Sequence, residues 1–267
     1  MLVSAPAISS ENVTTFEVGN APFGADRNQL SYLFINSYGG TATINGTSVR
    51  GKARPYWPDQ NYSPEEVETR IEQICAPNGI IAISRGGTEP LTGSDIDAFA
   101  AVTSHKQGLD VVNSFRKEID TAARGFGFGE EQIEQLTQVT SGDILQNETA
   151  AESVAILREV ASNSPKPGIA MDLWLKLGPL LRERGIEFAY GVTATKGPMY
   201  KYIKLMQSNG LGLGKIISTI TPDANGSPLK VGLCSIRFDL AKLQSLDTIG
   251  AAGKEHFKNF LRGSLHQ

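Results

Sequence analysis

The sequence predicts a protein of the α/β (α+β) class, in which helices flank a sheet. Hydrophobic residues make up 40% and charged residues 20% of the 267 residues, which is enough apolar material for a packed core. Apolar positions follow helical spacing in some segments and form short strand-like runs in others. Glycine, proline and Asn-Gly signals separate these segments, as turns do. By length alone, one or two domains are expected.

The composition argues against several classes of function. Lysine and arginine total 25, aspartate and glutamate total 28, and the net charge is -3, so nucleic acid bound through overall charge is not expected. No apolar run approaches the ~20 residues of a membrane-spanning helix. The first residues show neither a basic region nor a long apolar stretch, which predicts no signal peptide and a cytoplasmic location. Cys75 and Cys234 are too few for a disulfide framework, and the 3 histidines lack metal-ligand spacing.

In the first half of the chain, helix-start and turn signals mark most of the elements. The first twenty or so residues are polar and predict an extended arm or an edge strand. Asp26 can cap a helix, and Ser63-Pro64-Glu65-Glu66 combines a serine cap, a first-turn proline and a capping-box glutamate. Asn45-Gly46 predicts a hairpin turn. The expected helices span 26–38, 64–75 and 109–123, and the expected strands span 41–44, 47–50, 80–84 and 97–103.

In the second half, strands and helices alternate. The glycine-rich stretch 125–129 interrupts the helical pattern. Leu173 and Leu177 belong to the apolar stripe of a long helix, and Pro198 can begin another. Asn225-Gly226 joins two strands into an antiparallel pair. The expected helices span 130–137, 169–183, 198–208 and 256–261, and the expected strands span 153–161, 186–193, 215–220 and 230–238.

One strand-loop-helix unit carries a resemblance to a known family. Val160-Ala161-Ser162 ends a predicted strand, and Pro165-Lys166-Pro167-Gly168-Ile169-Ala170 leads into the long helix. This unit and the order of elements around it resemble the GNAT superfamily, the Gcn5-related N-acyltransferases. The signature loop of that family reads Arg/Gln-x-x-Gly-x-Gly/Ala and follows a strand that ends in Val-x-Pro. The match is best over 153–238, whereas 26–103 match only in element order.

The resemblance implies a fold and a domain organisation. The implied fold is a GNAT-like mixed, mostly antiparallel central sheet flanked by helices. The chain would form a single GNAT-like acyltransferase domain over residues 1–267. Within it, residues 106–149 would be an enlarged helical insertion, and a C-terminal extension would begin at about residue 239.

The loop predicts a phosphate-binding site for acetyl-CoA or another acyl-CoA as co-substrate. A helix N-terminus offers free N–H groups and partial positive charge, and Gly168 lets a pyrophosphate come close. From Lys166 to Lys215, eight basic residues stand against three acidic ones, a local charge of +5. An ordinary strand-to-helix turn remains the alternative. The residues that the resemblance assigns to acyl-CoA are Val160, Ala161, Ser162, Lys166, Pro167, Gly168, Ile169 and Ala170.

The resemblance further implies transfer of the acyl group by direct attack of a primary amine on the thioester. Either Glu159 or Glu152 could accept the amine proton, but their opposite parity lets at most one face the cleft unless the strand is bulged. A backbone N–H near Val160 would polarise the thioester oxygen. Met206 stands where the family has the tyrosine that protonates the leaving thiolate, so Tyr202, or else Tyr200, would take this role.

The departures from the family pattern keep other functions open. Pro165 replaces the first loop residue, and two prolines remove N–H donors from the loop. One alternative is a non-catalytic module that binds acyl-CoA or a protein. Another is an N-acyltransferase that uses long-chain acyl-CoA or acyl carrier protein. The acceptor could be a small-molecule amine or a peptide amine, and the sequence does not predict the oligomeric state.

Overall fold

The molecule is built around a seven-stranded sheet with the order β1-β4-β5-β6-β7-β9-β8. A computed structural model describes residues 15–19, 25–86, 89–106, 109–147, 153–163, 169–208, 214–222 and 231–242. The helix predicted at 256–261 lies outside these ranges. The strands are β1 (Thr15–Gly19), β4 (Gly79–Arg85), β5 (Ile96–Lys106), β6 (Ser153–Ser162), β7 (Ile186–Ala194), β8 (Gly214–Ile220) and β9 (Leu233–Asp239).

The sheet is mixed and mostly antiparallel. Its neighbouring strands pair antiparallel, except that β6 and β7 run parallel. The parallel pair requires a crossover, and helix α5 (Ile169–Glu183) supplies it. The early segment predicted as an arm or edge strand is the edge strand β1. The predicted fold class, a mostly antiparallel sheet flanked by helices, is confirmed.

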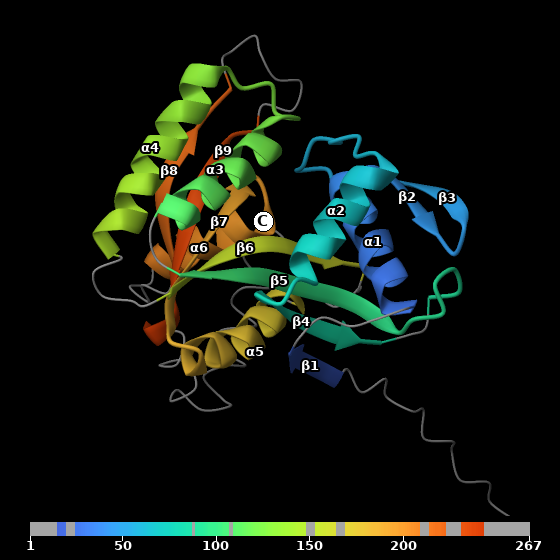
Figure 1. Cartoon of the computed structure of the whole chain (residues 1–267). Helices are drawn as coiled ribbons and strands as arrows, with labels where there is room; N and C mark the ends of the chain where they lie inside the picture. The colour runs from blue at the N-terminus through green and yellow to red at the C-terminus, as the bar shows by residue number, and fades with distance from the viewer. Residues whose placement is uncertain are drawn as a thin grey trace, which may run out of the picture.

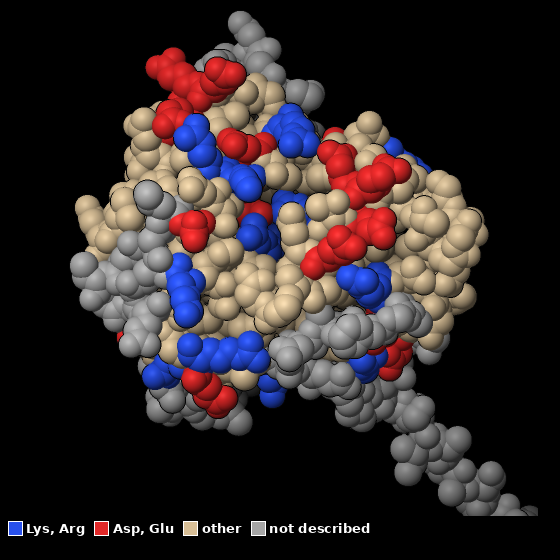
Figure 2. All heavy atoms as spheres, in the orientation of Figure 1, with Lys and Arg blue, Asp and Glu red and all other residues tan. Residues whose placement is uncertain are grey.

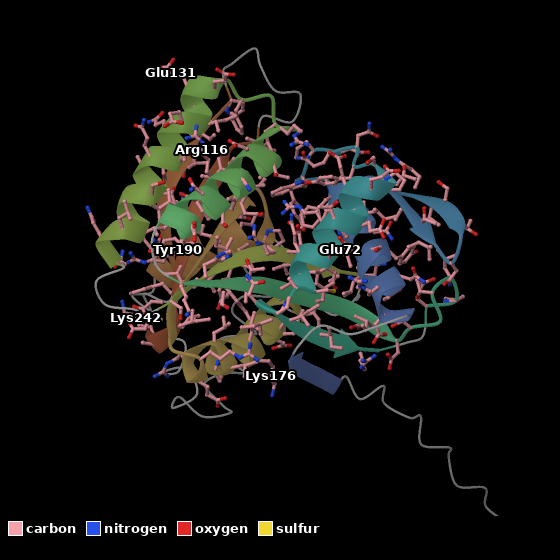
Figure 3. All side chains as sticks on the ribbon, viewed as in Figure 1. Glu72, Arg116, Glu131, Lys176, Tyr190 and Lys242 are labelled. Atoms are coloured by element: carbon pink, nitrogen blue, oxygen red, sulfur yellow. The ribbon has the colours of Figure 1, made fainter. Side chains whose placement is uncertain are left out.

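Helices cover both faces of the sheet (Figure 1). Helix α5 and α6 (Pro198–Ser208) lie on one face, which we call the back. The front face carries α1 (Ala25–Tyr38), α2 (Pro64–Ile74), α3 (Leu109–Ala123) and α4 (Glu130–Asn147). Figure 3 shows Arg116 of α3 and Lys176 of α5 on these opposite layers. A small hairpin, β2 (Gly40–Ile44) and β3 (Thr47–Gly51), lies beside α1.

Each face of the sheet has its own apolar core. On the back, Trp174 and Leu177 of α5 pack against sheet residues, and the Trp174 ring meets the Phe238 ring edge-on at 4.8 Å. On the front, one cluster lies under α1 and α2 and another under α3 and α4. The front helices therefore form two pairs, and the middle of the sheet lies between them.

The capping box predicted for α2 is present. The Ser63 hydroxyl accepts a hydrogen bond from the Glu66 amide at 3.2 Å, and the Glu66 carboxylate accepts one from the Ser63 amide at 3.0 Å. These two bonds satisfy donors that the helix start leaves free. The start of α2 is thus determined locally, as its sequence indicates.

Helix α4 is longer than predicted. The sequence indicates an end near residue 137, because threonines and Gly142 are weak helix formers, but α4 continues to Asn147. Tertiary contacts override this propensity. Thr140 is fully buried, and its hydroxyl bonds both the Leu136 carbonyl and the Ser235 hydroxyl at 2.7 Å. Ile144 is buried one turn later in the core under α3 and α4.

Gly51 allows β3 to approach α1 closely. A Cβ atom at Gly51 would lie 2.4 Å from the carbonyl carbon of Ile35. We expect Gly51→Ala to destabilise the protein by about 1–3 kcal/mol, since backbone must shift to make room. Gly142→Ala in α4 is the control, because its Cβ would meet nothing within 4 Å, and it should stabilise by about 0.5–1 kcal/mol. Urea unfolding measures both, and a Gly51→Ala protein as stable as wild type would contradict the close approach.

Candidate active site

Strand β6 has two strand neighbours over only its first half. Its pairing with β5 runs from Ser153 to Ser162, but its pairing with β7 runs only from Ser153 to Ile156. Beyond Ile156 the two parallel strands pair no further. The second half of β6 therefore presents backbone N–H and C=O groups to something other than a strand.

A β-bulge at Arg158 places two charged side chains of β6 on the front face. Leu157 pairs with Val102 and Glu159 pairs with Ala101, so Arg158 is the extra residue. Leu157 packs in the back core, whereas Glu159 reaches the front. A bulge changes the alternation of side chains, which is why neighbouring residues can share one face. The sequence predicts that at most one of Glu152 and Glu159 faces the cleft unless the strand is bulged, and β6 is bulged. Glu152 lies outside the described part of the chain.

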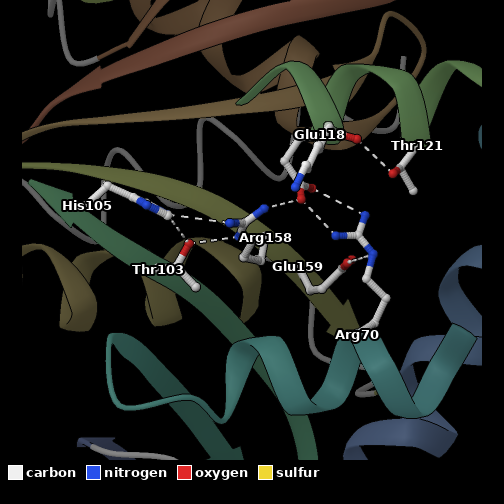
Figure 4. A network of polar contacts seen from close by, with 8 residues as sticks. Arg70, Thr103, His105, Glu118, Thr121, Arg158 and Glu159 are labelled. Atoms are coloured by element: carbon white, nitrogen blue, oxygen red, sulfur yellow. Dashed lines mark hydrogen bonds and ion pairs between the residues drawn. The ribbon is translucent and has the colours of Figure 1, made fainter. Parts of the chain in front are cut away.

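The front face holds a buried cluster of four charged side chains, which we call the Arg-Glu cluster: Arg70 of α2, Glu118 of α3, and Arg158 and Glu159 of β6 (Figure 4). Nη1 and Nη2 of Arg70 lie 2.8 and 3.3 Å from the two Glu118 oxygens. Nη1 of Arg158 also contacts Glu118. Glu159 receives only Nε of Arg70, at 3.6 Å. Glu118 is therefore the centre of the cluster, and Glu159 lies at its margin.

The cluster continues along β5 toward a histidine. Nε of Arg158 donates to the Thr103 hydroxyl at 2.8 Å, and Thr103 Oγ1 lies 2.9 Å from His105 Nε2. Nη2 of Arg158 is 3.4 Å from the same ring nitrogen. Burial, followed by the nearby Arg158 charge, lowers the pKa of His105. A neutral imidazole ring can accept a hydrogen bond at Nε2, which fits these contacts.

Glu159 is a buried carboxyl group with a raised pKa. The pKa of Glu159 is raised to about 8: burial raises it most, Arg70 lowers it, the charge of Glu118 raises it, and Arg158 lowers it. Its side chain is 5% exposed. A carboxyl group with a pKa near neutrality can take up and release a proton under ordinary conditions.

Side chains from α1 and from the loop after β3 contact the part of β6 that does not pair with β7. The Val160 amide donates to the Tyr38 hydroxyl at 3.2 Å, and this hydroxyl donates to the Val160 carbonyl at 3.0 Å. Arg54 donates to the Ser162 carbonyl. The Val160 amide expected to face a thioester oxygen therefore lies beside Glu159, with Tyr38 on it.

A row of aromatic rings extends from Tyr38. The Trp57 ring meets Tyr38 edge-on at 5.4 Å and Phe126 edge-on at 5.2 Å, and Phe128 stacks on Phe126 at 5.7 Å. The row runs from the end of α1 to the segment that follows α3. It connects the two pairs of front helices across the second half of β6.

The predicted acid Tyr202 lies in a different environment from Glu159. It is 7% exposed and packs in the back core with Leu173 and Leu177. Burial raises the pKa of Tyr202 well above its ordinary value, which makes its hydroxyl a weaker acid. Tyr200 is partly buried, with the Lys204 ammonium 5.3 Å from its ring centroid.

The predicted acyl-CoA residues are only partly described. Val160, Ala161 and Ser162 form the end of β6 that does not pair with β7. Ile169 and Ala170 begin α5, and Ile169 is buried. Lys166, Pro167 and Gly168 lie outside the described ranges. Among the basic residues counted toward this site, Lys215 instead contacts Asp143 on the front, at 3.1 Å.

The surface above the cluster carries both signs of charge. Figure 2 shows the front face hollowed near its centre, with basic and acidic atoms visible in the hollow. Acidic atoms border it over α2, whose exposed glutamates are Glu65, Glu66, Glu68 and Glu72. Within the ranges given above, no helix is long and apolar enough to span a membrane, and no group of three metal-ligating side chains gathers.

The comparisons with known proteins find solved acetyltransferase structures. No protein-family model matches the chain, and no curated protein matches it significantly. Arylalkylamine N-acetyltransferase 2 from Aedes aegypti is 14% identical, with 86% of this chain and 100% of that chain covered, at a TM-score of 0.49. The Drosophila melanogaster polyamine N-acetyltransferase is 10% identical, with 84% of this chain and 100% of that chain covered, at a TM-score of 0.48. An N-acetyltransferase from Staphylococcus aureus Mu50 is 14% identical, with 85% of this chain and 99% of that chain covered, at a TM-score of 0.44. All three are N-acetyltransferases.

The raised pKa of Glu159 predicts a pH-dependent stability. The unfolded chain loses this proton near the ordinary value of 4.5, and the folded chain holds it to about pH 8. Over this window the folded state binds more protons, so Glu159 lowers the stability as the pH rises. We therefore expect Glu159→Gln to gain stability relative to wild type between pH 5 and 8. Urea unfolding across this range measures the gain, with the exposed Glu134→Gln as control; a difference that does not change with pH would contradict the shift.

Proposed function

We propose that this protein is a divergent GNAT-type N-acyltransferase, which moves an acyl group from acyl-CoA to a primary amine. The observation that carries the proposal is the position of Glu159, a buried carboxyl with a pKa of about 8, next to the Val160 amide at the free edge of β6. A base and an N–H donor side by side suit the attack of an amine on a thioester.

The proposed reaction needs no covalent enzyme intermediate. The amine nitrogen attacks the thioester carbon while Glu159 accepts the amine proton, directly or through one water. The Val160 N–H stabilises the negative charge that develops on the thioester oxygen. The C–N bond forms, the C–S bond breaks, and the leaving thiolate takes a proton from Tyr202, Tyr200 or water. For this geometry the thioester oxygen replaces the Tyr38 hydroxyl on the Val160 amide.

The edge of β6 that does not pair with β7 fits the donor substrate. The arm that carries the thioester in acyl-CoA contains amide groups, which can pair with strand backbone as another strand would. We propose that Val160, Ala161 and Ser162 provide this edge. The loop with Lys166, Pro167 and Gly168 would hold the pyrophosphate together with Ile169 and Ala170 at the start of α5. Helices α3 and α4 would be the insertion into a single domain.

The acceptor is proposed to be a small-molecule or peptide amine. Primary amines are cationic at neutral pH, and the exposed glutamates of α2 beside the hollow attract cations. A buried base with a raised pKa is suited to deprotonate such an ammonium group.

A non-catalytic module is the second candidate, and a specific observation favours it. The Tyr38 hydroxyl holds both the N–H and the C=O of Val160, and the Tyr202 hydroxyl is buried in an apolar core. A protein that binds acyl-CoA or another protein without turnover would retain both features.

Acyl-CoA should stabilise the folded protein. Ligand at ~100 times its dissociation constant adds about 2.7 kcal/mol to the unfolding free energy. A thermal-shift series with acetyl-CoA and longer acyl-CoAs at low salt measures this effect. Matched amounts of ADP and of free CoA separate recognition of the nucleotide from that of the acyl arm. The absence of any shift at millimolar acyl-CoA would remove the donor from the proposal.

Removal of the base should reduce turnover without loss of acyl-CoA binding. We expect Glu159→Gln to lower kcat by about 10²–10⁴-fold, the usual contribution of general base catalysis. Tyr202→Phe should lower kcat by at least about tenfold if its hydroxyl is the acid. A thiol-release assay with a panel of primary amines gives both rates. Equal rates for Tyr202→Phe and wild type would reject the role of Tyr202, and an inactive wild type would favour the non-catalytic module.

A further inference from the structure

Glu118 enters the front face from a helix far from the rest of the site in sequence. It lies on α3, within the predicted insertion, and its side chain is 8% exposed. Its neighbours on the helix, Phe115 and Ile119, are buried at 1% and 0% exposure in the core under α3 and α4. Core packing therefore holds the Glu118 carboxylate between Arg70 and Arg158.

The two arginines direct their short contacts away from Glu159. Arg70 gives both terminal nitrogens to Glu118, at 2.8 and 3.3 Å, and leaves Nε for Glu159 at 3.6 Å. Arg158 gives Nη1 to Glu118, while its Nε and Nη2 face Thr103 and His105. A guanidinium group that is already engaged in two hydrogen bonds offers less stabilisation to a further carboxylate.

We propose that Glu118 is a positioning residue for the Glu159 base: it draws the guanidinium groups of Arg70 and Arg158 to itself and leaves Glu159 with one long contact. This inference rests on the proposed function, in which Glu159 takes the amine proton. A carboxylate paired closely with arginine would be a weak base, because the ion pair favours the ionised form. Glu118 thus keeps Glu159 able to accept a proton near neutral pH.

Few other groups near Glu159 can influence its proton affinity. The groups that face it are Tyr38 of α1, Tyr62 before α2, Arg70 of α2, Glu118 of α3 and Arg158 of β6, with His105 of β5 beyond Arg158. When both glutamates are ionised, the Arg-Glu cluster has equal numbers of positive and negative charges. Neutralising Glu118 leaves an excess positive charge beside Glu159, and neutralising Arg158 leaves an excess negative charge.

The test is a direct titration of Glu159 in the full-length protein without substrates. Carbon-13 NMR of labelled glutamate carboxyls follows the group, and Glu159→Gln assigns its signal. We expect Glu118→Gln to lower the titration midpoint by about one pH unit or more, and Arg158→Gln to raise it. Glu134→Gln removes the exposed partner of Arg116 and should leave the midpoint unchanged.

The opposite directions separate charge from loosening. A site that merely opens to water would move both midpoints down, toward that of an exposed glutamate. Two midpoints that fall together, or a Glu118→Gln midpoint that stays at the wild-type value, would overturn the role of Glu118. If Glu118→Gln loses its near-ultraviolet circular dichroism, Arg158→Gln decides by its direction alone. If Arg158→Gln does not fold, Arg158→Met, which also removes the charge, replaces it.

The amine assay is read separately from the titration. In an active enzyme, the acid limb of the kcat profile should follow the titration midpoint of each variant. Midpoints that move as expected in a protein without turnover would refute the acyltransferase proposal and leave the charge-sharing arrangement intact. If the acid limb of the kcat profile does not shift with the titration midpoints, Glu118 does not act on the reaction through Glu159.

Discussion

The arrangement of the front face depends on the unpaired second half of β6. After Ile156 the backbone of this strand loses β7 as a neighbour, and buried backbone groups without partners are costly. The Tyr38 hydroxyl and the Arg54 guanidinium supply the missing partners. Their engagement brings the end of α1 and the loop after β3 over the opening. The aromatic row that begins at Tyr38 then connects this region to the end of α3, so one gap in a strand ladder determines how both pairs of front helices meet.

The same region contains the most expensive interactions of the molecule. Placing two arginines and two glutamates under α2 and α3 removes four charges from water, and removing one partner of such a pair typically costs about 3–5 kcal/mol. The cost is tolerable because each guanidinium nitrogen of the two arginines lies near an acceptor. Glu159 is the least well paired of the four side chains, and its proton is the means by which its burial is accommodated. A group that folding leaves incompletely paired is chemically the most responsive one in the cluster.

Local signals in the sequence were sufficient for most of the secondary structure. The capping box at Ser63 and the apolar stripe of α5 act within a few residues, and both elements are found as predicted. The extension of α4 to Asn147 could not be predicted, since the hydroxyl bond between Thr140 and Ser235 joins residues 95 positions apart. The bulge at Arg158 likewise depends on register with β5, which no local pattern indicates.

The candidate site was predictable only where a single segment builds it. Glu159 and Val160 follow one another on β6; the resemblance placed Val160, and the sequence named Glu159 only as an alternative to Glu152. Arg70 flanks the buried face of α2, and Glu118 stands at helical spacing with the buried Phe115 and Ala122 of α3. A charged residue among apolar positions indicates a buried partner, but only the approach of α2 to α3 shows that this partner is Arg70. Tyr38 has the spacing of an ordinary apolar helix residue. Its hydroxyl accepts a hydrogen bond from the Val160 amide because β6 no longer pairs with β7 at that point. Helix α3, which carries Glu118, is therefore part of the electrostatics of the site. Because α3 is anchored by buried apolar side chains, it holds its carboxylate more rigidly than a surface loop would, and the proton affinity of Glu159 is tied to how α3 packs on the sheet.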